Sequence, residues 1–185
     1  MTIPNILTLS RVALIPVVIL LLFADDPAMR WWTFALFAAL AVTDYLDGYL
    51  ARALKQHSAL GALMDPIADK VLVAALVVAL VARGDIAGWD VAGAILILGR
   101  ELLVSGLREF LAQRDLPLPV TKLAKWKTTA QLVALALLIL APLAEPSQLP
   151  VISAIWWIAT VLTLITGLDY VRSAARQLRP ATGEQ

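Results

Sequence analysis

Long apolar runs, each close to the length needed to cross a bilayer, take up most of this chain and constrain its fold more than any other feature. The two clearest runs extend from Thr128 to Ala144 and from Pro150 to Tyr170, and Asp169 is their only charged residue. A membrane-spanning helix needs about 20 mostly apolar residues. The runs also lack the alternating polarity of outer-membrane strands. Because lipid cannot satisfy backbone polar groups, we expect these runs to be α-helices.

We predict an all-α, polytopic membrane protein with six transmembrane helices around a polar, cytoplasm-facing cavity. A hydrophobic fraction of 61% and a mean hydropathy of +0.82 are far outside the range of soluble domains. We expect one domain over residues 1–185, with a short basic tail from about residue 172. The predicted spans are Ile6–Phe23, Trp31–Tyr49, Asp65–Ala82, Trp89–Leu111, Thr128–Ala144 and Pro150–Tyr170.

The charges of the connecting segments predict the orientation. If the spans alternate, most Lys and Arg residues fall on one side, and only Arg30 and Arg83 fall in the opposite loops. The positive-inside rule then places the N-terminus, segment 112–127 and the C-terminal tail in the cytoplasm. Arg11 followed by the apolar Val12–Ala24 also fits a signal peptide, but residues from Pro4 onward lengthen the run toward spanning size.

Composition excludes several kinds of site. The chain has no cysteine, which rules out disulfides, thiolate metal ligands and cysteine nucleophiles. Its net charge is +1 and it has no long basic run, so nothing indicates a nucleic acid partner.

Four aspartates in the second and third predicted spans define the candidate site. Asp44 and Asp47 are spaced i, i+3, whereas Asp65 and Asp69 are spaced i, i+4, so each pair shares one helix face. Carboxylates beside apolar spans are costly unless cations neutralise them. Hard divalent ions prefer oxygen ligands, and two ions about 4 Å apart clamp a phosphoryl centre. We therefore predict two Mg²⁺ or Mn²⁺ ions bound together with a substrate that carries a di- or polyphosphate.

Small residues and one arginine accompany the carboxylates. Gly48 follows Asp44 by one helical turn, Ala51 follows Gly48, and Gly61 precedes Asp65 by one turn. Missing side chains let a ligand approach the helix backbone, although the same residues also serve helix packing. Arg52 fits either phosphate neutralisation or contact with lipid headgroups.

The pattern Asp44-x2-Asp47-Gly48-x2-Ala51-Arg52-x8-Gly61-x3-Asp65-x3-Asp69 resembles the signature of the CDP-alcohol phosphotransferase family, with every position filled. The resemblance implies a six-helix membrane fold and a metal site made by Asp44, Asp47, Asp65 and Asp69. Asp69 would also be the general base. The CDP group would be held by residues of the same motif: Asp44, Gly48, Ala51, Arg52, Gly61 and Asp65.

Further segments resemble the subgroup whose acceptor is sn-glycerol 3-phosphate. They include the opening Pro4–Arg11, Leu63–Lys70, Arg100-Glu101, Ser105–Glu109 and Lys125–Gln131. The implied reaction converts CDP-diacylglycerol and sn-glycerol 3-phosphate to phosphatidylglycerophosphate and CMP in the bacterial inner membrane, among membrane lipids. The candidates for binding the acceptor phosphate are Arg11, Arg100, Arg108, Lys122 and Lys125. The family also implies a homodimer, although the apolar helix surfaces fit lipid equally well.

Other readings of the same residues stay open at this point. Within the family, a cardiolipin synthase or a phosphatidylinositol phosphate synthase uses the same motif with another acceptor. A membrane prenyltransferase also places aspartates and magnesium around a diphosphate, but the Asp-Gly-x2-Ala-Arg core does not suit it. A cation transporter lined by carboxylates belongs to a different class. The lysines and arginines fit intrahelical ion pairs and a collar that contacts anionic lipids.

Overall fold

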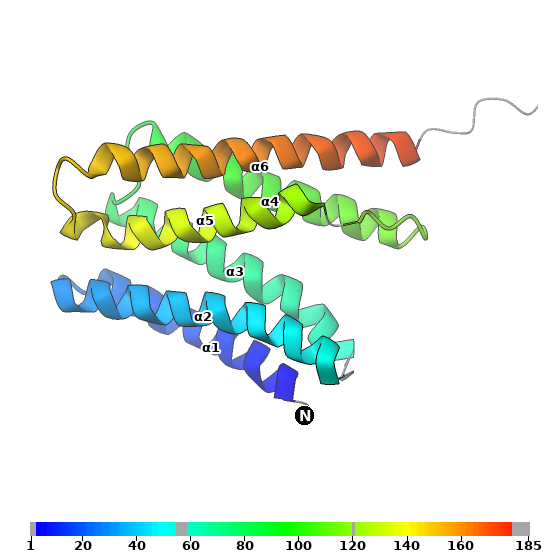
Figure 1. The fold of residues 1–185 in the computed structure, drawn as a ribbon, viewed down its shortest axis with the longest axis horizontal. Coiled ribbons are helices and arrows are strands. Elements are labelled where there is room, and N and C mark those ends of the chain that lie inside the picture. The colour runs from blue at the N-terminus through cyan, green and yellow to red at the C-terminus, as the bar shows by residue number, and fades with distance from the viewer. Residues whose placement is uncertain (1–2, 55–58, 120, 179–185) are drawn as a thin grey trace, which may run out of the picture. The chain divides into compact units, whose positions relative to one another are not determined.

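The computed structural model describes residues 3–54, 59–119 and 121–178, and within 3–8, 44–54 and 59–66 it describes the backbone alone. These residues form six α-helices and one short 3-10 helix, with no strand among them (Figure 1). The helices are α1 (Ile3–Phe23), α2 (Pro27–Leu54), α3 (Ala59–Arg83), α4 (Asp90–Ala112), α5 (Lys122–Leu140) and α6 (Leu149–Gln177), with η1 (Ala141–Leu143) after α5. The predicted all-α fold is confirmed.

Each predicted span corresponds to one helix of the structure. Five spans lie inside single helices, apart from Trp89, which immediately precedes α4. The span Thr128–Ala144 covers most of α5, then η1 and the residue that follows. Among the described residues, the segments Lys122–Leu143 and Leu149–Gln177 are long and apolar enough to cross a membrane. Leu9–Phe23, the part of α1 whose side chains are described, is a shorter apolar segment. The count of six crossings, and the cavity between them, stay predictions.

The chain divides into two compact units. Unit 1 contains residues 1–88 and 135–152, and unit 2 contains residues 89–134 and 153–185. In unit 1, α1 packs against both α2 and α3 (Figure 1). Val18, Leu22, Phe37, Leu76 and Leu80 are fully buried in this unit.

The helix ends of unit 1 follow from local sequence. At the start of α2, the Asp26 carboxylate accepts a 2.8 Å hydrogen bond from the Ala28 amide, and Pro27 occupies the first helical position. At the end of α3, Gly84 adopts a φ of +79°, which lets the Asp85 amide donate back to the Leu80 carbonyl at 2.9 Å. The turn delivers Asp85 beside Arg30 of α2.

Asp85 forms ion pairs with two arginines. Arg30 donates to both of its carboxylate oxygens, at 2.7 and 3.2 Å, and also donates to the Ile139 carbonyl at 3.3 Å. Arg83 lies 3.5 Å from the same carboxylate and 3.2 Å from Asp25. The side chains of Arg30 and Asp85 are only 6% and 10% exposed, whereas that of Asp25 is 91% exposed. A largely buried ion pair therefore joins α2, the end of α3 and the end of α5.

Asp85→Asn should destabilise the protein by about 3–5 kcal/mol, because it leaves the buried Arg30 guanidinium without a full counter-charge. Thermal unfolding of the detergent-solubilised protein measures the loss. Asp25→Asn is the matched control, since an exposed pair contributes at most about 1 kcal/mol. Equal losses in the two variants would contradict the importance of the buried pair.

Unit 2 contains α4, the first part of α5 and most of α6. One end of its core consists of Val104, Leu111, Leu118, Tyr170 and Ala174. Near the start of α4, the Asp90 carboxylate accepts hydrogen bonds from the Ser153 hydroxyl at 3.0 Å and from the Trp157 ring at 2.7 Å.

A tryptophan near the end of a membrane span usually lies at the membrane surface, but Trp156 lies in the interior of unit 2. It is fully buried, and its ring nitrogen donates to the Asp90 carbonyl at 3.0 Å. A Cβ on Gly93 would lie only 2.6 Å from that nitrogen, so the glycine lets the indole approach α4. Trp31, Trp32, Trp89 and Trp126 are exposed, as an interfacial belt requires.

Candidate functional site

The backbone places the predicted carboxylates on two consecutive helices of unit 1. Asp44 and Asp47 belong to the C-terminal half of α2, and Asp65 and Asp69 belong to the N-terminal half of α3. Gly48, Ala51 and Arg52 follow on α2, and Gly61 precedes on α3. Because both segments are α-helical, the i, i+3 and i, i+4 spacings put each pair on one helix face.

The two carboxylate pairs lie at the same end of unit 1. Only residues 55–58 separate the two helices, and a chain advances at most about 3.6 Å per residue. A set of four carboxylates at one end of a helix pair fits the oxygen preference of Mg²⁺ and Mn²⁺. The side chains of Asp44, Asp47 and Asp65 lie outside the described residues. The described side chains alone contain no group of three metal-binding residues.

Asp69 is the one predicted metal ligand whose side chain is described. It is half-buried on α3 and makes a polar contact within the protein. The next helical turns place Leu72, Val73 and Leu76 in the core. Every residue of α3 between Lys70 and Arg83 is apolar, so Asp69 lies one residue before the charged part of the helix ends.

The predicted acceptor residues are divided between the two units. Arg11 belongs to α1 of unit 1 and is 2% exposed. Arg100, Arg108, Lys122 and Lys125 belong to unit 2, where only Arg100 is buried. The exposure of the other three also fits contact with anionic headgroups.

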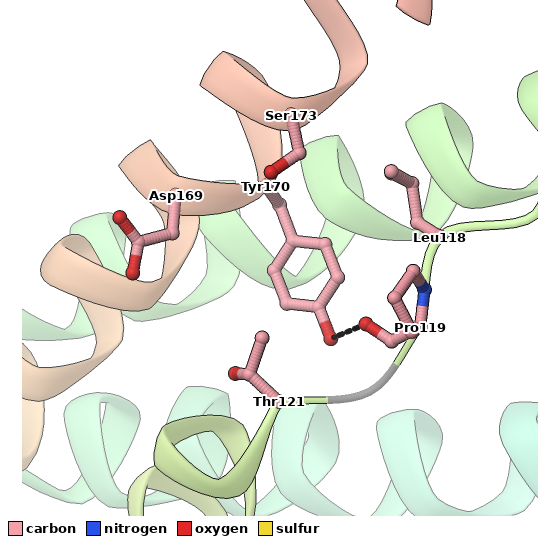
Figure 2. Close-up of a pocket in the computed structure, with 6 residues that line it drawn as sticks. All are labelled: Leu118, Pro119, Thr121, Asp169, Tyr170 and Ser173. Atoms are coloured by element: carbon pink, nitrogen blue, oxygen red, sulfur yellow. Dashed lines mark hydrogen bonds between the residues drawn. The ribbon is translucent and has the colours of Figure 1, made fainter.

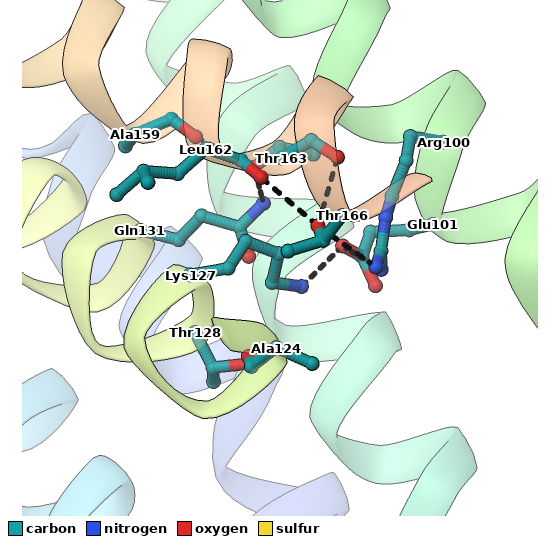
Figure 3. A network of polar contacts seen from close by, with 10 residues as sticks. All are labelled: Arg100, Glu101, Ala124, Lys127, Thr128, Gln131, Ala159, Leu162, Thr163 and Thr166. Atoms are coloured by element: carbon teal, nitrogen blue, oxygen red, sulfur yellow. Dashed lines mark hydrogen bonds and ion pairs between the residues drawn. The ribbon is translucent and has the colours of Figure 1, made fainter. Parts of the chain in front are cut away.

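A buried polar network links α4, α5 and α6 around Arg100 (Figure 3). The Glu101 carboxylate accepts from Lys127 at 2.5 Å and from Arg100 at 3.2 Å. Arg100 also donates to the Thr166 hydroxyl at 3.1 Å, and Gln131 donates to the Thr163 hydroxyl at 2.9 Å. All three helices therefore contribute partners to one network in unit 2.

Two residues of α6, Gly167 and Tyr170, pack against the Arg100 side chain. Its guanidinium carbon lies 5.6 Å from the centre of the Tyr170 ring, in cation–π contact. A Cβ on Gly167 would lie 2.8 Å from the Arg100 Cγ. The absence of a side chain at Gly167 therefore leaves room for the aliphatic part of the Arg100 side chain. Arg100 is thus fixed by Glu101, Thr166, Gly167 and Tyr170.

The α6 part of this network is absent from the sequence prediction. Thr160, Thr163 and Thr166 are all buried, and each hydroxyl donates to a carbonyl one turn earlier in α6. Bonded in this way, threonine is tolerated in an apolar helix and keeps an acceptor for a neighbour. The i, i+3 spacing of the threonines, followed by Gly167, is the sequence signal of this polar stripe.

Gly167→Ala should displace Arg100 and lower stability by about 1–3 kcal/mol, the usual cost of overpacking. The unfolding temperature and the enzymatic activity should both fall, because Arg100 can no longer pack against α6. Gly99→Ala on α4 is the control, because nothing lies within 4 Å of its added Cβ. Retention of full stability in the Gly167 variant would show that Arg100 is not tightly held.

A small pocket of about 50 Å³ lies between the segment before α5 and the last turns of α6 (Figure 2). Tyr170 donates a long 3.4 Å hydrogen bond to the Pro119 carbonyl at its edge. The other lining residues are Leu118, Thr121, Asp169 and Ser173. A volume of this size holds a few waters and is too small for a CDP group, so the pocket is not a donor site.

The similarity to known proteins covers the helices that carry the Asp motif and those that carry the predicted acceptor-binding residues. A family model described as CDP-alcohol phosphatidyltransferase matches residues 1–166. The chain belongs to this family. Members generally depend on a divalent metal, which agrees with the donor set of α2 and α3.

Three relatives extend over almost the whole chain and carry one name, CDP-diacylglycerol–glycerol-3-phosphate 3-phosphatidyltransferase. The relative from Cereibacter sphaeroides is 40% identical over 96% of this chain and 97% of its own length. That from Rickettsia bellii is 41% identical over 94% and 95%. That from Shigella flexneri is 39% identical over 95% and 96%. The similarity therefore includes α6, beyond the end of the family model.

Proposed function

We propose that the protein transfers the phosphatidyl group of CDP-diacylglycerol to sn-glycerol 3-phosphate, giving phosphatidylglycerophosphate and CMP. The observation that carries the proposal is the nearly full-length similarity to relatives with this enzyme name. The complete Asp motif on α2 and α3 supplies the residues for the chemistry.

Asp44, Asp47, Asp65 and Asp69 are proposed to hold two Mg²⁺ or Mn²⁺ ions. When bound, these ions neutralise phosphate charge that develops as the phosphoanhydride breaks. The four carboxylates would hold the ions where α2 ends and α3 begins, because hard divalent cations prefer oxygen ligands. The small residues Gly48, Ala51 and Gly61 let the CDP group approach α2 and α3, and Arg52 adds a positive charge.

Asp69 is proposed as the general base. The acceptor's primary hydroxyl ionises at a pKa far above neutrality, so a positioned carboxylate assists its attack. The hydroxyl oxygen forms a bond to the phosphorus that carries diacylglycerol, Asp69 receives the proton, and the bond from that phosphorus to the CMP oxygen breaks. CMP leaves with the electron pair, which balances the step.

The acceptor phosphate is proposed to bind among Arg11, Arg100, Arg108, Lys122 and Lys125. Guanidinium and ammonium groups are the usual phosphate donors in proteins. Arg100 is the best organised of the set, because its side chain is already fixed within unit 2. A preset cation loses little conformational freedom on binding.

The setting is proposed to be the bacterial inner membrane, with the Asp motif facing the cytoplasm. The protein is a membrane protein by its apolar helices and its relatives. The excess of Lys and Arg on one side of the predicted spans supports the orientation. We also propose a homodimer, which leaves the exposed apolar helix faces partly covered by a second copy.

The acceptor is tested by offering the purified protein CDP-diacylglycerol together with different alcohols in parallel. The panel contains sn-glycerol 3-phosphate, phosphatidylglycerol, inositol 3-phosphate and serine. We expect CMP release and a new phospholipid with sn-glycerol 3-phosphate alone. Preference for phosphatidylglycerol would indicate a cardiolipin synthase, and preference for inositol 3-phosphate would indicate a phosphatidylinositol phosphate synthase. Ion flux into sealed vesicles without nucleotide turnover would instead indicate a transporter.

A further inference from the structure

Tyr170 connects the Arg100 side chain to the segment that precedes α5. It belongs to α6 and is 5% exposed. The guanidinium carbon of Arg100 lies over its ring, 5.6 Å from the ring centre. The Tyr170 hydroxyl donates to the Pro119 carbonyl at 3.4 Å, as Figure 2 shows. One buried aromatic side chain therefore contacts both a buried arginine and the loop between α4 and α5.

The ring and the hydroxyl of Tyr170 differ in what they contribute. A length of 3.4 Å is beyond the usual range for an O–H donor and an oxygen acceptor, so the hydroxyl contributes little. A cation over an aromatic face is attracted to the negative charge of that face, and the attraction is strongest where water is excluded. Arg100 is 8% exposed, so both partners are withdrawn from water. The ring is therefore the part of Tyr170 that acts on Arg100.

The direction of the Arg100 guanidinium depends on few contacts. Its Nη1 donates to Glu101 at 3.2 Å and its Nη2 donates to Thr166 at 3.1 Å. Both bonds are longer than the 2.7–2.9 Å or so that is typical of a charged pair. The Nε is buried and makes no hydrogen bond within the described part of the chain. A guanidinium held by two long bonds needs the ring contact to keep a fixed direction.

We propose that Tyr170 is a positioning residue for the acceptor, which acts through Arg100 rather than by touching substrate. Its ring holds the guanidinium in place before the acceptor phosphate arrives, so that less conformational freedom is lost on binding. The inference rests on the proposed function, because it takes Arg100 as a ligand of the phosphate of sn-glycerol 3-phosphate. It brings into acceptor binding an uncharged residue that lies beyond the end of the family model, at residue 166.

Tyr170→Leu should raise KM for sn-glycerol 3-phosphate about three- to thirtyfold, the range expected when a desolvated cation–π contact is lost. Tyr170→Phe should leave this KM near its wild-type value, because the ring stays. KM for CDP-diacylglycerol should be unchanged in both variants. Steady-state kinetics with each substrate varied in turn measures the two constants.

Leu111→Ala is the control for a loss of core packing. Leu111 is fully buried in the same core as Tyr170, but it lies about three helical turns from Arg100 along α4. The control should lower the unfolding temperature, as Tyr170→Leu does, and leave both KM values unchanged. A rise in KM for sn-glycerol 3-phosphate in Leu111→Ala as large as in Tyr170→Leu would reduce Tyr170 to a structural residue.

A ring-fluorinated phenylalanine at position 170 separates the charge of the ring face from its shape, and it gives an answer even where Tyr170→Leu does not fold. Fluorine withdraws the negative charge from the ring face and changes the size of the ring little. We expect the unfolding temperature of Tyr170→Phe together with a raised KM for sn-glycerol 3-phosphate. An unchanged KM in the fluorinated variant, an equal rise for both substrates, or a rise in Tyr170→Phe as large as in Tyr170→Leu would overturn the proposal. Absence of turnover in the wild-type protein would instead contradict the proposed function.

Discussion

Asp69→Asn is expected to lower kcat by about 10²–10⁴-fold, the usual contribution of a general base. Asparagine keeps the size of the side chain and one oxygen ligand, but it cannot accept the hydroxyl proton. Binding of CDP-diacylglycerol should therefore persist. Single-turnover CMP release, together with titration of the donor into the variant, measures the two effects separately.

The control is Asp169→Asn on α6, which removes an exposed carboxylate in unit 2. Its kcat should equal that of the wild-type protein. Wild-type turnover in Asp69→Asn would exclude Asp69 as the base, whereas loss of donor binding along with turnover would restrict it to metal binding. Asp69 is half-buried and lies one residue before the charged part of α3 ends, which agrees with a residue at the edge of a site.

Removal of divalent metal should abolish activity completely. Four carboxylates at one end of unit 1 and a substrate diphosphate repel one another unless cations intervene. Dialysis against excess chelator, followed by addition of Mg²⁺, Mn²⁺ or Ca²⁺ separately, tests this by CMP release. Mg²⁺ and Mn²⁺ should restore turnover, whereas Ca²⁺, with its longer bonds and looser geometry, should restore less.

The chelation result is compared with a stability measurement on the same samples. The unfolding temperature should rise when Mg²⁺ or Mn²⁺ returns, because an ion that binds only the folded state stabilises it. Asp44→Ala with Asp47→Ala should remove that rise, since one of the two carboxylate pairs is gone. Full activity in excess chelator would rule out a metal-dependent site.

The sequence predicted the helices well because the responsible physics is local. A long apolar run has to satisfy its own backbone in a membrane, so each of the six predicted spans fell on a helix. The residues of the Asp motif fall on α2 and α3, where single helical turns separate the members of each pair, but the metal site that they would form stays a prediction. Both features depend on spacing along one helix and on little else.

Partners on different helices were not predictable in the same way. Lys125 and Lys127 both looked like cytoplasmic lysines, yet two positions correspond to about 200° around a helix. Lys125 is exposed, whereas Lys127 is buried against Glu101. Which side of α5 faces α4 depends on tertiary packing, and spacing alone does not fix it.

The polar stripe of α6 was missed for a related reason. Thr160, Thr163 and Thr166 count as nearly apolar in a hydropathy average, and the last predicted span was recognised only by its hydrophobic character. Two of the hydroxyls matter for the network, because Thr166 accepts from Arg100 and Thr163 accepts from Gln131. Gly167 and Tyr170 also pack against Arg100. This contact depends on the packing of α6 against α4, which the sequence of either helix alone does not show.

The most direct test of the account follows the phosphatidyl group itself. CDP-diacylglycerol labelled in its diacylglycerol part is incubated with purified protein and Mg²⁺, with and without sn-glycerol 3-phosphate. The account predicts labelled phosphatidylglycerophosphate and CMP in a one-to-one ratio, and neither product without the acceptor. CMP release that does not depend on sn-glycerol 3-phosphate, or no CMP release at all, would contradict it.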